Sequence, residues 1–205
     1  MEMPNSIVKR AASLQAVGRA ILYAVLLLLA TAAVTAAEPQ TETAALAGPD
    51  VRFLDLQSTM SAGWQAVTPS SSMRLAQFSI RDAERGGEAE TIFYYFGRGQ
   101  GGSIDNNVAR WRSQFRDDRG QMPEAGIRRF DVAGMAVTVA HIQGRYARGI
   151  GAGPGGEGKP GQTLLAALVE TLAGTVIIQL HGDTPLVDDL EPGFIAMLKA
   201  IRRPA

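Results

Sequence analysis

Alternating apolar and polar residues predict β-strands along much of the chain. In residues 73–80, Phe78 and Ile80 fall on one face and Gln77 falls between them on the other, which is the period of two expected of a strand. Residues 91–96 are rich in aromatic and β-branched side chains, which pack well on a pleated surface. Two other stretches have a weaker extended pattern: residues 51–56, where an initial helical turn is the alternative, and residues 64–67.

Two hairpins are predicted further along the chain. Residues 127–132 and 135–146 read as strands that meet at Ala133-Gly134, where glycine can adopt the positive φ of a tight turn. Residues 163–170 and 175–181 form the second pair. Strands that follow one another through hairpins predict a mainly antiparallel sheet.

A helix is predicted after the strand at residues 91–96. Ile104, Val108, Trp111 and Phe115 follow one another at steps of four, three and four, which places them on one face of an α-helix. Ser103 directly precedes this stripe, and its hydroxyl is suited to cap the helix N-terminus.

A closing helix completes the predicted fold. Phe194, Leu198 and Ile201 share one face, and Pro192 is best placed at the helix start because proline lacks the N–H that interior positions need. Residues 148–162, rich in glycine, are predicted to be an exposed, mobile loop. The fold class is therefore α+β, with an antiparallel sheet of about five to seven strands flanked by helices.

The first 37 residues have the pattern of an export signal. A basic stretch contains Lys9, Arg10 and Arg19, and an uncharged run with four leucines at its centre follows it. Small residues close the run, so cleavage is expected after Ala36 or Ala37. The alternative is an uncleaved membrane anchor, because a run of about 18 apolar residues is at the lower limit of a spanning helix. Both alternatives predict a bacterial periplasmic or secreted domain.

The domain boundaries follow from this interpretation. Residues 38–50 are predicted to be a flexible leader, because alanine, threonine and proline without a helical stripe bury little apolar surface. Residues 51–205 are predicted to be a single domain. The composition, with 46% hydrophobic and 20% charged residues, suits a packed globular fold.

Charge and cysteine content exclude several function classes. Removing residues 1–37 takes away three basic residues and Glu2, which leaves a net charge of −2. A nearly neutral domain does not attract polyanions at long range, so nucleic-acid binding is not expected. The chain has no cysteine, which excludes disulfides, thiolate metal sites and a lipid-modified N-terminal cysteine.

The glycine-rich loop before the first helix is the strongest candidate for a binding site. A strand, a glycine-rich loop and a helix N-terminus together favour an anion, because backbone N–H groups and the helix dipole point toward it. The spacing matches neither the phosphate loop nor the dinucleotide fingerprint. The alternative is that the glycines only let the chain turn sharply. The candidate residues are Gly99, Gly101, Gly102, Ser103, Asn107, Arg110 and Gln114.

The sequence predicts no catalytic set, metal site or cofactor. The two histidines, His141 and His181, have no metal-ligand spacing. Either could serve as a base if Ser103 lay nearby as a nucleophile, which keeps a small hydrolase open as the alternative function.

Several tracts carry a resemblance to other proteins: residues 72–78, 93–103, Asn107, Arg110, Trp111, Gln114, Phe115 and 165–180. In these tracts the chain resembles an uncharacterised family of bacterial exported proteins. Many members of that family look like lipoproteins, but the family implies no activity. At fold level, the order of hairpins and final helix is similar to PsbP and Mog1-like domains. The expected function is a non-catalytic accessory or binding domain of the cell envelope, with an envelope protein or a small anionic ligand as partner.

Overall fold

The computed structural model describes residues 46–84, 86–147 and 158–204, which belong to a compact unit formed by residues 39–205. The predicted signal segment and residues 148–157 of the predicted loop lie outside the described residues. In the described part of the chain, no helix is long and apolar enough to cross a membrane.

The main sheet is antiparallel throughout, which confirms the α+β class. Eight strands are found in it among the described residues, and β6 and β7 pair with different parts of β8. Across the sheet, the strands lie in the order β3 (Gln65–Val67), β4 (Arg74–Arg81), β5 (Glu88–Tyr95), β10 (Gly174–Asp183), β9 (Lys159–Thr171), β8 (Met135–Tyr146) and then β6 (Phe115–Arg116) and β7 (Gly126–Val132). The sheet exceeds the predicted size because β3 and β6 are very short edge strands, which leave little periodic signal.

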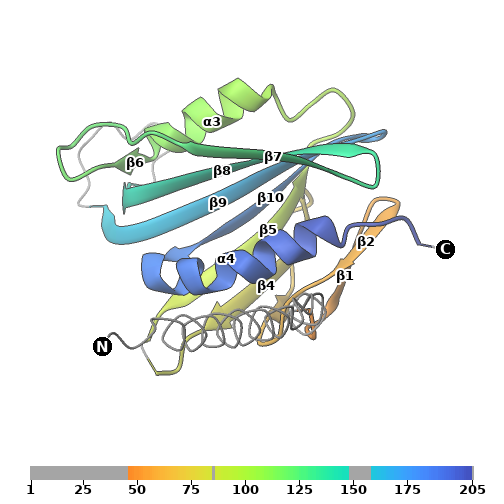
Figure 1. The fold of residues 1–205 in the computed structure, drawn as a ribbon, viewed down its shortest axis with the longest axis horizontal. Coiled ribbons are helices and arrows are strands. Elements are labelled where there is room, and N and C mark those ends of the chain that lie inside the picture. The colour runs from red at the N-terminus through yellow and green to blue at the C-terminus, as the bar shows by residue number, and fades with distance from the viewer. Residues whose placement is uncertain (1–45, 85, 148–157, 205) are drawn as a thin grey trace, which may run out of the picture. The chain divides into compact units, whose positions relative to one another are not determined.

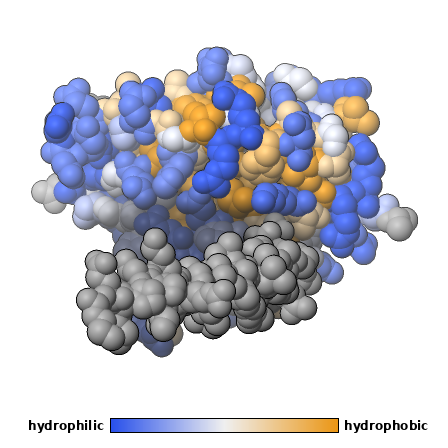
Figure 2. All heavy atoms as spheres, in the orientation of Figure 1, coloured by the Kyte–Doolittle hydropathy of each residue, from blue (hydrophilic) through white to orange (hydrophobic). Residues whose placement is uncertain are grey.

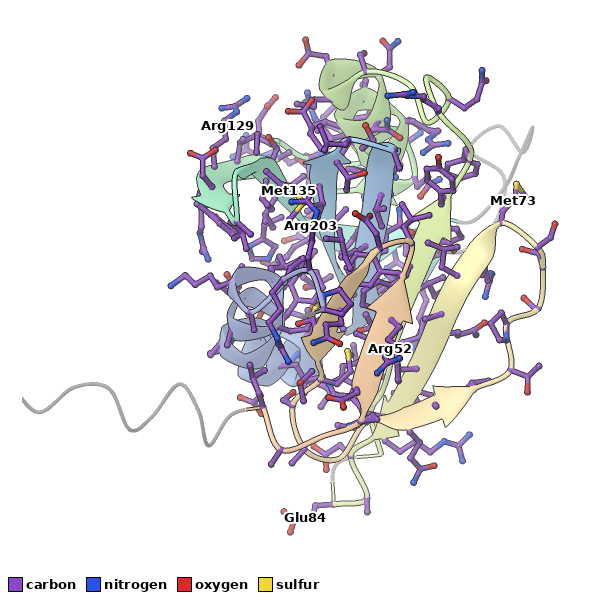
Figure 3. All side chains as sticks on the ribbon, turned by 90° about the vertical axis from the view of Figure 1, so that its right-hand side faces the viewer. Arg52, Met73, Glu84, Arg129, Met135 and Arg203 are labelled. Carbon is purple, nitrogen blue, oxygen red and sulfur yellow. The ribbon has the colours of Figure 1, made fainter. Side chains whose placement is uncertain are left out.

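Helices α3 and α4 cover opposite faces of this sheet, as Figure 1 shows. Helix α3 (Ile104–Ser113) packs over β6 and β8, with the buried Trp111 and the following Phe115 against apolar residues of β8 and β9. Helix α4 (Thr184–Lys199) packs on the other face against β9 and β10. The β3–β4–β5 side of the α3 face is therefore not covered by α3. In Figure 3, Met73 marks the start of β4 on the side of the sheet away from α4.

A separate hairpin packs beside α4. Strands β1 (Asp50–Phe53) and β2 (Leu56–Thr59) form a two-stranded sheet, with Leu54 at positive φ in the turn. The Ser58 hydroxyl donates a hydrogen bond of 2.6 Å to the Met197 carbonyl, and Gln57 forms a β-bridge with Arg202. Residues 51–56, for which both a strand and a helical turn were open, therefore belong to this hairpin.

Three predicted boundaries are wrong. The leader ends before residue 50, because the Gly48 N–H donates to the Met60 carbonyl at 3.0 Å. The loop predicted at residues 148–162 ends earlier, because residues 159–162 belong to β9. Pro160 is tolerated in this strand because β9 pairs there with β8 alone; its pairing with β10 begins at Gln162.

The third error concerns the closing helix. Helix α4 begins at Thr184, eight residues before Pro192, which lies inside it. Pro185 occupies the first turn, where a missing N–H costs no hydrogen bond. The Asp183-Thr184-Pro185 sequence was therefore the start signal, and Pro192 lies at an exposed position inside the helix.

The visible surface is mainly hydrophilic. Figure 2 shows hydrophilic side chains over much of the described surface on this side of the molecule, with hydrophobic residues between them. The most exposed large apolar side chains are Leu172 (79% exposed), Met122 and Met73, which lie in separate turns and loops. Single exposed apolar residues of this kind are ordinary on a protein surface.

Candidate functional site

The glycine-rich loop forms a helix cap, as the sequence predicts. Gly97, Gly99, Gly101 and Gly102 all have φ between 70° and 101°, a region that other residues rarely adopt. The Ser103 hydroxyl accepts a hydrogen bond of 3.2 Å from the Asn106 N–H. The glycines therefore serve the turn from β5 into α3, and Ser103 caps the helix.

Asn107 holds this loop together from the first turn of α3. Its side chain is buried, at 3% exposed. Its Nδ2 donates to the Gly101 carbonyl at 2.6 Å and to the Ser103 carbonyl at 2.9 Å, and its Oδ1 accepts from Arg110 at 2.6 Å. The amide is therefore fully engaged inside the protein.

Four of the predicted site residues come together beside this loop. Gly101, Gly102, Asn107 and Arg110 line a shallow hollow of about 450 Å³, together with Phe96, Gln100 and Asn106. Gly99 and Ser103 do not line it, and Gln114 lies at the other end of α3. The seven candidate residues thus do not form one site, and their role in binding stays a prediction.

Replacing Asn107 with alanine is expected to lower the free energy of unfolding by about 2 kcal/mol, because the Gly101 carbonyl loses its side-chain donor and the Ser103 carbonyl keeps only the backbone N–H of residue 107. Asn106→Ala is the matched control, since Asn106 is exposed and contributes to the cap through its backbone. Urea unfolding of both variants measures the difference. A loss for Asn107→Ala no larger than that for Asn106→Ala would contradict this role.

The structure separates the residues on which a serine hydrolase would depend. His141 lies on the α4 face of β8, and its buried Nε2 has no hydrogen-bond partner among the described residues. His181 lies on the α3 face of β10, and its ring centroid is 4.4 Å from that of Tyr146. Ser103 caps the N-terminus of α3, whereas His181 packs near Phe115, beyond its C-terminus. A ten-residue helix is about 15 Å long, so Ser103 is out of reach of either histidine.

A polar groove lies on the part of the α3 face that α3 does not cover. Strand pairing places Gln65, Ser79, Glu90 and His181 side by side in one row across β3, β4, β5 and β10. Together with Tyr94, Gln114, Tyr146 and Gln179, among others, they line a cavity of about 660 Å³. We call this cavity the polar groove. Gln114 is the only predicted site residue in it.

Several polar side chains in the polar groove have no partner among the described residues. In the described part of the chain, five lining residues make no side-chain hydrogen bond or ion pair: Gln65, Ser79, Glu90, Gln114 and Gln179. Ser79 and Glu90 are half-buried, and so are Gln114 and Gln179. Amides, a hydroxyl and a carboxylate supply both donors and acceptors to whatever occupies the groove.

Two ion pairs lie at one end of the polar groove. Arg81 pairs with Glu88 at 2.9 Å, and Lys159 pairs with Asp183 at 2.7 Å. Asp183 also accepts hydrogen bonds from the Gln162 amide at 2.6 Å and from the Glu88 N–H at 3.0 Å. The hydrogen bond from Lys159, with help from Glu88 and Gln162, lowers the pKa of the Asp183 carboxyl below its usual value of 3.8, against the opposing effect of burial.

Stability should therefore depend on Asp183 in acid. Because its pKa is lower in the folded state, its stabilisation is complete above the unfolded-state pKa near 3.9 and disappears as the pH falls through the folded-state pKa. Asp183→Asn should cost about 2 kcal/mol at pH 7, as expected for charge-assisted hydrogen bonds, and less at pH 2, below the unfolded-state pKa. Urea unfolding at both pH values tests this, with the exposed Asp131→Asn as control. An equal cost at both pH values would contradict it.

The row across the polar groove does not have the order of a catalytic triad. In a triad, the histidine lies between the nucleophile and the carboxylate, because it must reach both. Here Glu90 lies between Ser79 and His181, which are two strands apart. Adjacent strands are about 4.8 Å apart, so the two side chains stand about 10 Å from each other.

Within the described residues, no group of three or more potential ligands could hold a metal ion either.

Comparisons with known proteins were made at the levels of sequence and fold. A scan against models of protein families finds no match, and a search of curated proteins finds none. Among solved structures, the chain is similar to the solution structure of cyanobacterial PsbP (CyanoP) from Synechocystis sp. PCC 6803. The TM-score is 0.47 at 14% identity, over 78% of this chain and 94% of that chain.

Proposed function

We propose that this chain is an exported, non-catalytic binding domain of the cell envelope that holds a small polar ligand in the polar groove. The observation that carries the proposal is the set of five groove side chains that have no partner among the described residues. Four of them lie on strands of the main sheet, and Gln114 is the C-cap of α3. Ligand sites are concave and combine a few polar groups with apolar or aromatic walls. Tyr94 and Tyr146 supply those walls here. Export is supported by the pattern of residues 1–37.

The arrangement supports binding rather than catalysis. The row of Ser79, Glu90 and His181 has the wrong order for nucleophile activation, and Ser103 is used as a helix cap. The groove side chains instead offer hydrogen-bond donors and acceptors spread over a rigid surface. Because the β-sheet backbone moves little, ligand binding loses little backbone conformational entropy.

A thermal-shift experiment with the purified full-length chain tests the proposal. The compounds are ethanolamine, spermidine, ethylene glycol, N-acetylglucosamine, acetate and phosphate. At a hundred times its dissociation constant, a ligand adds about 2.7 kcal/mol of stability, which raises the Tm by about 5–10 °C in a chain of this size. We expect at least one of these compounds to produce such a rise.

Two variants locate the binding site. Gln179→Trp fills the polar groove with an indole and should abolish the Tm rise. Arg129→Trp makes the same kind of change on the exposed part of β7, on the opposite side of Figure 3 from Met73, and should leave the rise unchanged. No stabilisation by any compound, or stabilisation that survives Gln179→Trp, would contradict the proposal.

A further inference from the structure

The polar groove contains one negative charge that nothing in the described structure balances. Arg81 is paired with Glu88, and Lys159 is paired with Asp183. The Glu90 carboxylate has no ion pair or hydrogen bond with the described residues, although it lies half-buried in the middle of the row. The charges at the end of the groove thus cancel each other, and Glu90 remains as an unpaired acceptor.

Occupying the groove would change the surroundings of Glu90. A ligand that covers this carboxylate removes water from it, and a buried charge is costly unless a counter-charge or donors replace that water. A neutral ligand replaces the water only in part, and an anion adds repulsion. A cation restores the lost interaction, so the groove should select positively charged ligands.

The walls of the groove favour the same chemistry. Tyr146 supplies an aromatic ring to the lining of the groove, and the face of an aromatic ring attracts a cation. The side-chain amide oxygens of Gln65 and Gln179 have no hydrogen-bond donor among the described residues, so they can accept hydrogen bonds from an ammonium group.

We propose that the ligand of the polar groove carries an ammonium group, which binds to the Glu90 carboxylate; this inference rests on the proposed function. It replaces the anionic ligand that the glycine-rich loop suggests from sequence. The ammonium can belong to a polyamine or to a small amino alcohol, since both present the same group to Glu90.

Titration calorimetry on the full-length chain tests this inference with matched probes. Spermidine and ethanolamine carry the ammonium, and ethylene glycol is the neutral counterpart of ethanolamine. We expect spermidine or ethanolamine to bind and ethylene glycol not to bind. The difference in affinity between spermidine and ethanolamine shows whether the ammonium belongs to a polyamine or to a small amino alcohol. Glu90→Gln should weaken amine binding at least tenfold, whereas Glu90→Asp, which keeps the charge, should retain part of the affinity.

The control separates a local contact from a general charge effect. Glu170→Gln removes a carboxylate from an exposed part of β9 outside the groove and should change amine affinity less than twofold. Unchanged amine affinity in Glu90→Gln, or an equal loss in Glu170→Gln, would overturn the inference. If N-acetylglucosamine binds in a way that Gln179→Trp abolishes while the amines do not bind, the ammonium inference fails and the binding function of the groove stands.

Discussion

Gly182→Ala is expected to lower the free energy of unfolding by about 3 kcal/mol, because the new methyl group would meet backbone atoms rather than a flexible side chain. A Cβ at this buried position in β10 would collide with the Glu88 carbonyl oxygen and would lie 2.6 Å from the Ala89 Cβ. Both atoms belong to β5, the neighbouring strand. The strands cannot separate there without breaking the pairing that shapes the polar groove.

Gly126→Ala is the matched control, since Gly126 also lies in a strand. The nearest atom to its Cβ would be the His141 Cβ at 3.7 Å, an ordinary contact. This variant should change stability by less than about 1 kcal/mol, and alanine even reduces the entropy of the unfolded chain. Urea unfolding of both variants measures the contrast. Similar losses for the two would contradict the close approach of β10 to β5.

Trp111→Ala is expected to cost about 3–5 kcal/mol, the usual range for truncating a buried large aromatic residue. Trp111 is 1% exposed and is the largest side chain that α3 places against the sheet. Its loss should loosen the whole helix, including Gln114 at the helix C-terminus in the wall of the polar groove. Function and stability are therefore expected to fall together.

Two measurements check this prediction. Urea unfolding gives the loss of stability, and hydrogen exchange shows whether the α3 amides lose protection before those of the sheet. Ser113→Ala, at an exposed position of the same helix, should cost less than about 1 kcal/mol. A cost for Trp111→Ala below about 1 kcal/mol would mean that α3 is not anchored through this ring.

Local patterns predicted the elements well where periodicity alone decides the structure. The alternation in residues 135–146 predicts β8 with the bounds that the structure has. Ile104, Val108 and Trp111 lie in α3 behind the Ser103 cap, as predicted, whereas Phe115, predicted on the same helical stripe, belongs to β6 because the helix ends at Ser113. The start of α4 was missed because Pro192 was taken for the first turn, although Pro185 follows a better capping sequence. The helix continues through Pro192 because the apolar residues on either side of it are buried against the sheet.

The polar groove could not be predicted in the same way. Gln65, Ser79, Glu90 and His181 are far apart in sequence and become neighbours only through the register of four strands. In each strand, these residues look like an ordinary solvent-facing side. Only the position of α3, which covers β8 but not β4, turns that side into a concave surface. Gln114 was named as a candidate only because it follows the helix that begins at the predicted loop site.

Cysteine protection tests most directly whether the polar groove, rather than the glycine-rich loop, is the binding site. The chain has no cysteine, so Ser79→Cys and Ser103→Cys each introduce a single thiol, one in the groove and one beside the loop. The rate of maleimide modification is measured with and without spermidine, ethanolamine or N-acetylglucosamine. We predict that the compound that stabilises the chain slows modification at position 79 and leaves position 103 unchanged. Protection at position 103 without protection at position 79 would contradict the account.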